Sequence, residues 1–270
     1  MSAFPPEIVA LQDGFTDQVS YSLNGVTFTT GQFEGKPVVM FLSGVSMVNA
    51  AMTTQLALDH FDIKRIVFSG IAGGVDPDLS IGDVVVSAHW GQYLQGTAAR
   101  ADGDGFALPG WMSSDFRNFG MFHAIPFGVL KEDLAEPDNR FWFDADPALL
   151  AVATDISETL SLADCNAEAA CLTRAPQIVV GGNGVSGPIF VDNATLREHV
   201  FTSFDARVLD MESAGVAQVA FANDVPYIAF RSLSDLAGGG DGANEMNTFM
   251  SLAASNAAIV MRGFIAALDD

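Results

Sequence analysis

Two stretches of this sequence place a carboxylate where an apolar run ends, residues 209–215 and 231–238. The acids of interest are Glu212 and Asp235, about 23 residues apart. Residues 226–230, before the second acid, predict a buried strand. Open α/β folds place their chemistry where strands leave the core, and paired carboxylates there suit acid–base catalysis. With a helical pattern between them, the two acids predict a βαβ-like unit that brings both carboxylates to one cleft.

A glycine-rich stretch, residues 69–74, follows the apolar run 65–68. Glycines in such a loop let a ligand approach the backbone closely. The stretch is not a Walker loop, since no Gly-Lys-Ser/Thr follows, and it lacks the helix spacing of a dinucleotide fingerprint. Taken alone, it is more often a tight turn than a binding loop.

The remaining pattern predicts the elements that position these residues. Residues 5–7 are expected to form a turn or loop, and 18–33 antiparallel strands. Buried strands are expected at 37–42, 65–68, 83–87, 177–182 and 226–230. Helices are expected at 45–61, 146–162, 212–223 and 245–268, with a short helix capped by Asp192 or Asn193 and ending at Phe201. The alternation predicts one α/β domain over residues 1–270, a mixed central sheet flanked by helices.

Residues 91–145 differ from the rest of the chain. They hold Gly and Asp clusters and little periodicity. We expect a loop-rich elaboration with short helices, laid over the core; long loops of this kind are often functional lids.

Composition limits the classes of protein. The chain has 270 residues, 49% of them hydrophobic, and a mean hydropathy of +0.29, so it can bury a large core. No apolar stretch is expected to approach the ~20 residues that span a bilayer. No signal peptide is visible, although one could have been removed. No membrane partner is therefore expected.

The formal charge of −21 comes from 33 acidic and 12 basic residues. A field of that sign repels phosphate backbones, so nucleic-acid binding is excluded as an expectation. An acidic, soluble surface explains the charge more simply than an acidic binding face does. A small neutral ligand remains compatible with it.

The only cysteines are Cys165 and Cys171, and the histidines at 60, 89, 123 and 199 show no metal-ligand spacing, so no metal site is expected. The cysteines could close a small disulfide loop, which would imply an oxidising compartment, or be two unrelated thiols. The location therefore stays open: cytoplasmic, or periplasmic or secreted if a signal peptide was removed and the disulfide forms.

The order of these motifs resembles the purine nucleoside phosphorylase/uridine phosphorylase family, over roughly residues 3–95 and 177–270. The motifs are 43–51, 70–74 with 81–85, 210–212 and 231–235. Within the family they look like the 5′-methylthioadenosine/S-adenosylhomocysteine nucleosidases, and GIAGG and RSLSDLAGGG also look like the plant bark-storage-protein branch. The resemblance implies no cofactor and a homo-oligomer, either a dimer or a trimer or hexamer.

The resemblance implies a role for each acid. Asp235 matches the general acid that protonates purine N7, and burial can raise a carboxyl pKa enough to hold that proton. Ser234 would orient Asp235. Glu212 matches the residue that binds the ribose 2′- and 3′-hydroxyls, because charged acceptors make strong hydrogen bonds. Met211 would lie against the sugar.

The remaining substrate contacts also come from the resemblance. Phe190 and the Val191 backbone match the segment that stacks on the purine, and Met246 or Phe249 is expected to border the 5′-substituent pocket. The residues matching the glycine-rich substrate loop are Ile71, Ala72 and Gly73. Ile71 stands where nucleosidases usually carry Ser or Thr, so a hydroxyl contact is expected to be lost.

Glu7 is the candidate base for the attacking water, since residues 3–8 resemble the family's Ala-Met-Glu-Glu-Glu-Val with two prolines in place of glutamates. Inverting glycoside hydrolysis needs such a base on the other face of the sugar. The apolar first strand of the family is expected to be lost from the sheet or trimmed from the chain. Because no arginine lies in the 43–49 or 70–74 loops to hold a phosphate, water is the expected acceptor.

Two alternatives accompany this prediction of a purine nucleosidase. One is a phosphate-dependent purine nucleoside phosphorylase. The other is a non-catalytic nucleoside-binding or storage-like protein, which the change at Ile71 motivates. Each acid could also have a purely structural role, Asp235 as a helix cap and Glu212 as a solvated acid in the first turn of a helix. Arg231 is expected to be a structural partner of a cleft carboxylate.

Overall fold

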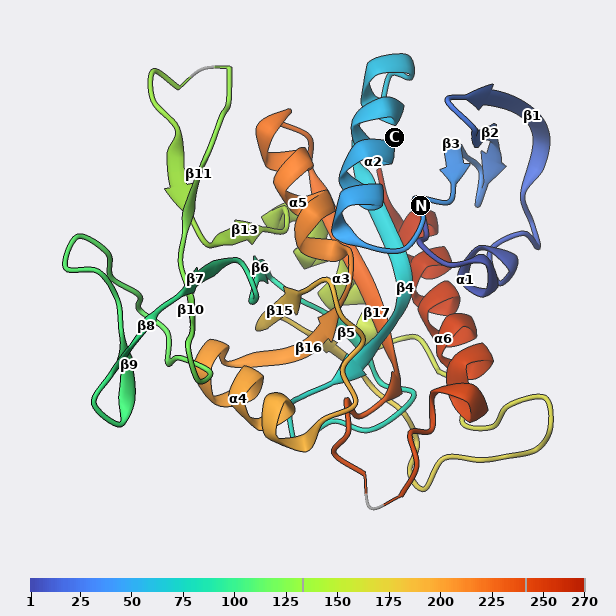
Figure 1. The fold of residues 1–270 in the computed structure, drawn as a ribbon. Coiled ribbons are helices and arrows are strands. Elements are labelled where there is room, and N and C mark those ends of the chain that lie inside the picture. Colours follow the sequence, from blue (N-terminus) through green and yellow to red (C-terminus); the bar gives the residue numbers. More distant parts are fainter. Residues whose placement is uncertain (133, 241, 270) are drawn as a thin grey trace.

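The computed structural model describes residues 1–132, 134–240 and 242–269. Its centre is an eight-stranded mixed sheet in the order β13-β6-β15-β16-β4-β17-β5-β14 (Figure 1). The strands are β4 (Ile66–Gly74), β5 (Val84–Val86), β6 (His89–Gln92), β13 (Trp142–Asp144), β14 (Ile178–Val180), β15 (Asn183–Ser186), β16 (Ala206–Asp210) and β17 (Tyr227–Asp235). Helices flank this sheet, so the predicted single-domain α/β class is confirmed.

The two longest strands, β4 and β17, run parallel side by side through the core. All nine residues of β17 are buried, as the apolar run predicts. Its register with β4 runs from Tyr227↔Ile66 to Leu233↔Ala72, and a bulge then brings Asp235 opposite Gly73. The glycine stretch is therefore strand, and the prediction of a loop there is wrong. Pairing with β17 extends β4 through these small residues.

The prediction of a βαβ-like unit is also wrong, because its two strands run in opposite directions. Strand β16 pairs antiparallel with β4, through Leu209↔Gly73, whereas β17 is parallel to β4. The chain from β16 through α5 to β17 therefore joins two strands of opposite direction. Both strands nevertheless reach the end of β4, where Leu209 of β16 and Asp235 of β17 each lie opposite Gly73.

The predicted helices are present, as α2 (Met47–His60), α3 (Pro147–Ser157), α4 (Ala194–Phe204), α5 (Ser213–Ala222) and α6 (Met246–Ala267). Asn193 caps α4 by accepting a hydrogen bond from the Leu196 amide, as one of the two expected caps. The prediction of a turn or loop at residues 5–7 is wrong. A short helix, α1 (Pro5–Val9), begins there because proline is compatible with the first helical position.

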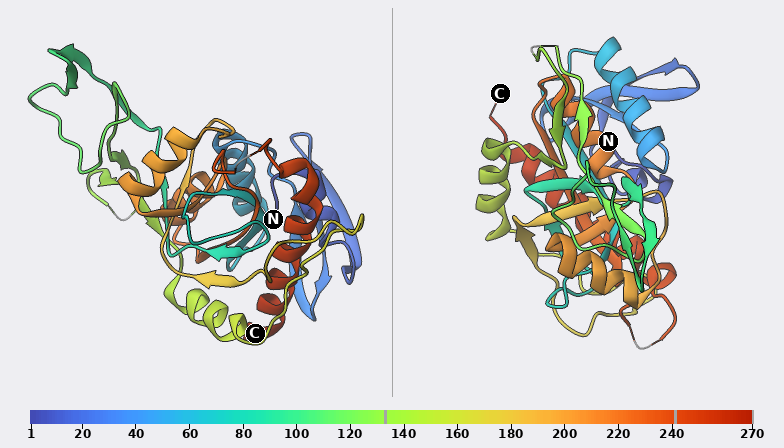
Figure 2. Two further views of the ribbon diagram at one scale, coloured as in Figure 1. Left: turned by 90° about the horizontal axis from the view of Figure 1, so that it is seen from below. Right: turned by 60° about the vertical axis from the view of Figure 1, so that its left-hand side comes forward.

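Two hydrophobic clusters separate the helices into two layers. The cluster around Phe68, Trp90 and Tyr227 includes the buried faces of α2 and α5. The cluster around Phe230 and Phe264 includes those of α3 and α6. The central sheet lies between the layers and is held by both (Figure 2).

A separate antiparallel sheet, β1 (Thr16–Leu23), β2 (Val26–Phe33) and β3 (Lys36–Phe41), confirms the predicted strands before residue 42. It lies at one end of the molecule, next to α2 and α6 (Figures 1 and 2). Ser2 forms a parallel bridge with Leu42 just after β3, so the start of the chain lies between this sheet and β4.

Between β6 and β13, residues 93–141 form short antiparallel strand pairs rather than the expected helices. The strands are β7 (Gly96–Ala98), β8 (Arg100–Asp102), β9 (Gly105–Ala107), β10 (Phe122–Ala124), β11 (Phe127–Val129) and β12 (Asp138–Arg140), paired as β7–β10, β8–β9 and β11–β12. Within 91–132 and 134–145 the structure contains no helix. The hairpins project away from the sheet instead of covering it (Figures 1 and 2), so the expectation of helices laid over the core is wrong.

The C-terminal helix corrects the expectation about apolar length. α6 has 22 residues and is long and apolar enough, by length and composition, to cross a membrane. Most of it is buried, however, and it packs on β17 and β4. A helix that covers a buried sheet is apolar over much of its surface for that reason.

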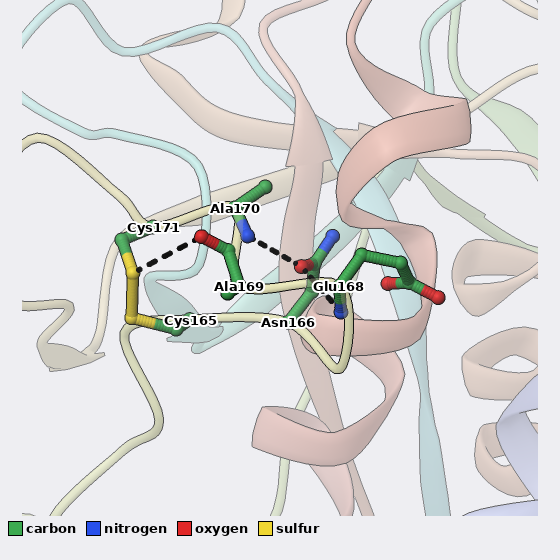
Figure 3. Close-up of a disulfide and its surroundings, with 6 residues drawn as sticks. All are labelled: Cys165, Asn166, Glu168, Ala169, Ala170 and Cys171. Carbon is green, nitrogen blue, oxygen red and sulfur yellow. Dashed lines mark hydrogen bonds between the residues drawn. A yellow bond between two sulfur atoms is a disulfide. The ribbon is translucent and has the colours of Figure 1, made fainter.

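The two cysteines are joined. Cys165 and Cys171 form a disulfide that closes a small loop, in which the Asn166 side chain accepts hydrogen bonds from the Glu168 and Ala170 amides (Figure 3). Of the two alternatives that the sequence left open, the structure has the disulfide.

Candidate active site

A fully buried arginine, Arg231, lies at the centre of the polar interior. Its Nε is 2.8 Å from Oδ2 of Asp210, and its Nη2 is 3.6 Å from Oε2 of Glu212. Its Nη1 is 3.9 Å from Oε1 of Glu7. The guanidinium also stacks on the Phe68 ring, 4.1 Å from its centroid. We call these three carboxylates and their shared arginine the Arg231 cluster. Arg231 is thus the carboxylate partner that the sequence predicted.

Burial and charge act against each other in this cluster. Burial raises the pKa of Glu7 and raises that of Glu212 to about 7, while the charge of Arg231 lowers both. Burial works to lower the pKa of Arg231, but the carboxylates of the cluster reverse this and raise it. One guanidinium therefore serves three acids, and part of the negative charge is held as bound protons near neutral pH.

Asp210 organises the start of α5 and was missed by the sequence reasoning. Its Oδ1 accepts the Ser186 hydroxyl and, at 3.2 Å each, the amides of Glu212 and Ser213. Ser186 Oγ in turn accepts the Ala214 amide at 2.8 Å. An acid just before a helix, satisfying free amides of its first turn, is a signal that the sequence did contain. Through these bonds Asp210 fixes the backbone that carries Glu212.

The second oxygen of Glu212 is held from the opposite side of the site. Oε1 accepts the Ser46 amide at 3.0 Å, at the entry to α2. Ser46 has φ +93°, a backbone conformation that non-glycine residues rarely adopt. Strain of this kind, on the order of 1–3 kcal/mol, is retained mainly where function requires the geometry. Glu212 is thus a buried carboxyl group with the Ser46 amide at one oxygen and Arg231 near the other, and it is not a solvated acid in the first turn of a helix.

Glu7 is attached directly to β4. Its Oε2 accepts the Ala3 and Phe4 amides at 2.8 and 2.9 Å, and its Oε1 accepts the Ile71 amide at 2.9 Å. The side chain is 3% exposed. These amide bonds lower its pKa, yet the cost of burial dominates and raises it. Glu7 is therefore a carboxyl group fixed beside Ile71 that can exchange a proton.

Asp235 ends β17 and is held by groups that differ at its two oxygens. Oδ1 accepts the Ala237 amide at 2.8 Å and lies 3.4 Å from Nδ2 of Asn244. Oδ2 accepts a hydrogen bond from the Ser234 hydroxyl at 2.9 Å, and the Ala72 carbonyl, 3.4 Å from that hydroxyl, is its alternative acceptor. Burial raises the pKa of Asp235. The N–H donors at Oδ1 cannot turn away from a proton there, whereas the Ser234 hydroxyl can donate to the Ala72 carbonyl instead, so a proton on this carboxyl belongs on Oδ2.

Strand β4 connects Glu7 with Asp235. Ile71 bonds to Glu7, and a Cβ on Gly73 would lie 3.3 Å from Oδ1 of Asp235. Two strand residues span about 7 Å. Neither acid points into bulk solvent, since Asp235 is also 3% exposed. A raised-pKa carboxyl therefore lies at each end of this short segment of β4.

The other candidate residues are more dispersed. Met211 is half-buried beside Glu212, Val191 is buried and Phe190 is 55% exposed. Met246 begins α6, whereas Phe249 packs in a core cluster with Ile81 and Leu252. The described residues record no hydrogen bond or ion pair that joins these side chains to the acids.

Two cavities in the described part of the chain lie away from the acids. A groove of about 860 Å³ runs between β3, β4 and α6, lined by apolar residues such as Val38, Ile66 and Met261. A second cavity of about 250 Å³ lies at the base of the hairpins, beside Tyr93 and His199. Glu7, Glu212 and Asp235 line neither cavity, so we locate the site by these carboxyl groups, whose chemistry is specific, rather than by cavity volume.

Within the described residues no group of three or more His, Cys, Asp or Glu side chains could hold a metal ion.

Comparison with known proteins gives one consistent result. The family model described as "Phosphorylase superfamily" matches residues 1–266. A Mycobacterium tuberculosis 5′-methylthioadenosine/S-adenosylhomocysteine nucleosidase is 29% identical over 261 residues, which cover 96% of this chain and 93% of that protein. In the structural comparison, an MTAN mutant of Helicobacter pylori with 5′-methylthioadenosine in its active site has a TM-score of 0.74 at 23% identity, covering 99% and 96% of the two chains. The nucleosidase of Colwellia psychrerythraea in complex with adenine has a TM-score of 0.72 at 25% identity, covering 99% and 93%.

Proposed function

Because this chain belongs to the phosphorylase superfamily, we propose that it is a purine nucleosidase that hydrolyses the N-ribosidic bond of 5′-methylthioadenosine, S-adenosylhomocysteine or a related purine nucleoside. The relatives named above carry that activity in their names, and they match nearly the whole length of this chain. One observation carries the assignment to this site: two buried carboxyl groups with raised pKa values, Glu7 and Asp235, lie at the two ends of residues 71–73 of β4.

The reaction follows from the protonation state of each acid. Asp235 gives its Oδ2 proton to purine N7, and the electron pair of the C1′–N9 bond leaves with the neutralised base. Glu7, ionised, takes a proton from water, whose oxygen bonds to C1′ as positive charge develops on the sugar. Glu212 accepts hydrogen bonds from the ribose hydroxyls. After the reaction Glu7 is protonated and Asp235 is ionised. Before the next turnover Glu7 must release its proton to solvent and Asp235 must take one up.

Water is favoured over phosphate by the charge of the Arg231 cluster. A phosphorolytic site holds a dianion, usually with free guanidinium groups. Arg231 is the guanidinium beside this site, and it faces Asp210, Glu212 and Glu7. Three carboxyl groups surround this one guanidinium, and their excess negative charge repels a phosphate dianion. Neutral water is not repelled.

Contacts with the rest of the nucleoside complete the proposal. Ile71, Ala72 and Gly73 present the backbone of β4 to the substrate. Ser234 orients Asp235. The purine stacks on Phe190 and the Val191 backbone, and Met211 lies against the sugar. Met246 or Phe249, from the first turn of α6, borders the 5′-substituent, and Met246 is favoured because Phe249 packs in a core cluster.

A release assay tests the activity. Purified protein is incubated with 5′-methylthioadenosine, S-adenosylhomocysteine, adenosine and inosine, with and without phosphate, and free base is measured. We expect base release without phosphate, with the free sugar as product, and loss of release in Asp235→Asn. Strict phosphate dependence with a sugar 1-phosphate product would assign a phosphorylase instead. Adenine binding without any base release would assign the non-catalytic alternative.

We further propose that the protein forms a homo-oligomer and works in an oxidising compartment. Val45, Val48 and Met52, at the start and on the outer face of α2, are 42%, 77% and 61% exposed, and neighbouring exposed apolar residues of this kind are a feature of protein–protein interfaces. Disulfides such as Cys165–Cys171 persist outside the reducing cytoplasm. Light scattering tests the first proposal, and thiol counting in protein taken directly from cells tests the second.

A further inference from the structure

Asn244 lies where three parts of the proposed site meet. Its Oδ1 accepts the Met246 amide at 2.9 Å, at the start of α6. Its Nδ2 is 3.1 Å from Oδ1 of Asp192 and 3.4 Å from Oδ1 of Asp235. Asp192 directly follows Phe190 and Val191, the proposed purine-stacking segment. One side chain therefore touches the helix proposed to border the 5′-substituent, the segment proposed to hold the base, and the acid.

The bond to Met246 determines which way the amide of Asn244 faces. Since Oδ1 is used as an acceptor, Nδ2 is directed toward the two carboxylates, and an amide nitrogen has one hydrogen for each of them. Reversing the amide would place Oδ1 against two carboxylate oxygens and Nδ2 against an N–H donor. The orientation is thus fixed by its three partners.

The main chain just after Asp235 packs closely against the residues that follow the purine-stacking segment. The Asn193 amide donates to the Ala237 carbonyl at 3.1 Å. Gly238 has φ +88°, and a Cβ there would lie 2.3 Å from the Asn193 nitrogen. Only glycine fits this close approach. The loop after Asp235 is therefore attached to residues 192–193 by its main chain, and Asn244 adds the side-chain link.

We propose that Asn244 is a positioning residue for the reaction, which holds Oδ1 of Asp235 as an acceptor so that Oδ2 carries the proton toward the purine, and which ties the acid to the purine-stacking segment through Asp192. This inference rests on the proposed function and goes beyond it, because it assigns roles to Asn244 and Asp192.

The charges around the acid give the two residues opposite effects. The Asn244 hydrogen bond lowers the pKa of Asp235, and the charge of Asp192 raises it, both within the larger upward effect of burial. Other charged groups near this loop are Arg197 of α4, which lies against Gly239, and Glu245, which precedes α6. Arg197 donates to the Gly74 carbonyl. These groups are unchanged in the variants below.

The test compares Asn244→Ala and Asp192→Asn with Asn247→Ala, an exposed asparagine in the first turn of α6. We expect Asn244→Ala to lower kcat by between about ten- and a hundred-fold, as misplaced reacting groups do, and Asn247→Ala to stay within twofold of wild type. The falling, alkaline limb of the pH–kcat profile should move to higher pH in Asn244→Ala and to lower pH in Asp192→Asn. A merely structural role for Asn244 would lower thermal stability without these opposite shifts.

A second measurement does not depend on turnover. The carboxyl ¹³C signal of Asp235, assigned by its loss in Asp235→Asn, is titrated in each variant. The midpoint should rise in Asn244→Ala and fall in Asp192→Asn. Unchanged midpoints, or shifts of the same sign, would overturn the inference even if the protein proves inactive. If wild type releases no base but the midpoints move as expected, the proposed function fails and the positioning of Asp235 stands.

Discussion

Arg231 packs against Gly70 so closely that a Cβ on Gly70 would lie 2.2 Å from its Nη1 and 2.6 Å from Oε1 of Glu7. The two residues are opposite each other in the β4–β17 register. The guanidinium therefore occupies the space that a side chain on β4 would fill. The small residues of β4 thus make room for the Arg231 cluster, in addition to any role in admitting a ligand.

We expect Gly70→Ala to destabilise the fold by about 1–3 kcal/mol, the usual effect of overpacking a closed interior. Both atoms that the methyl group would meet belong to the buried Arg231 cluster, so neither can move to solvent. Gly110→Ala, where a Cβ meets nothing within 4 Å, is the matched control. Urea unfolding of the two variants measures the difference, and equal midpoints would contradict the packing described here.

Replacing Arg231 with Met should be more severe. The change leaves Glu7, Asp210 and Glu212 buried without a cation, and unpaired buried charge typically costs about 3–5 kcal/mol. Arg262→Met is the control, because Arg262 pairs with Glu34 and Asp13 near the surface, where an ion pair contributes about 0–1 kcal/mol. Urea unfolding should separate the variants clearly. Similar losses in both would show that the buried carboxylates do not need their arginine.

The sequence predicted the elements well where local pattern decides them. The run before Asp235 is a buried strand, and Asn193 caps its helix. The failures occur where partners distant in sequence decide the outcome. Residues 70–73 are strand because β17 pairs with them, residues 73–74 pair with β16, and the direction of β16 depends on that pairing. In 91–145, weak periodicity left the short hairpins indistinguishable from loops with helices.

The site shows the same limit. Asp210 belongs to the family-like motif at residues 210–212. Its hydrogen bonds to Ser186 and to the amides at the start of α5 depend on the pairing of β15 with β16, which the motif does not encode. Arg231 could be predicted as a carboxylate partner, but its three partners come from three separate segments. Asn244 and Asp192 carry no signal except proximity in the fold. The roles given to the individual acids stay predictions.

The disulfide loop should support α6. Asn166 donates to the Thr248 carbonyl at 2.9 Å, and Leu172 packs beside Phe249 and Leu252. A disulfide that closes so short a loop contributes about 2 kcal/mol through the entropy of the unfolded chain. We expect the Cys165→Ser/Cys171→Ser double variant to lose that amount in urea unfolding. Treating wild type with a reductant should reproduce the loss, while leaving the double variant unchanged as the control.

The pKa of Glu212 predicts how stability varies with pH. Its folded-state pKa, about 7, is above the ordinary value of 4.5, so the folded protein holds a proton that the unfolded chain releases. That contribution to stability is complete below about pH 4.5 and is lost as pH rises through 7. Glu7 and Asp235 act in the same direction. Glu212→Gln should flatten the fall in unfolding free energy between pH 5 and 8, which urea titration at each pH measures; an unchanged slope would assign the effect to other groups.

The two acids on β4 predict a bell-shaped pH dependence of kcat. Glu7 must be ionised to activate water, so the rate rises as pH passes its raised pKa; Asp235 must be protonated, so the rate falls as pH passes its own. Glu7→Gln should lower kcat by about 10²- to 10⁴-fold and abolish the rising limb, because a neutral amide cannot accept the proton. Asp235→Asn should do the same to the falling limb. Glu34→Gln, at a partly exposed acid paired with Arg262, should leave both limbs in place. Glu7 is bonded to Ile71 and Asp235 faces Gly73, so the two carboxyls are only two strand residues apart. If one substitution removed both limbs, the two carboxyls would titrate as a coupled pair. The separate roles of base and acid proposed for them would then be wrong.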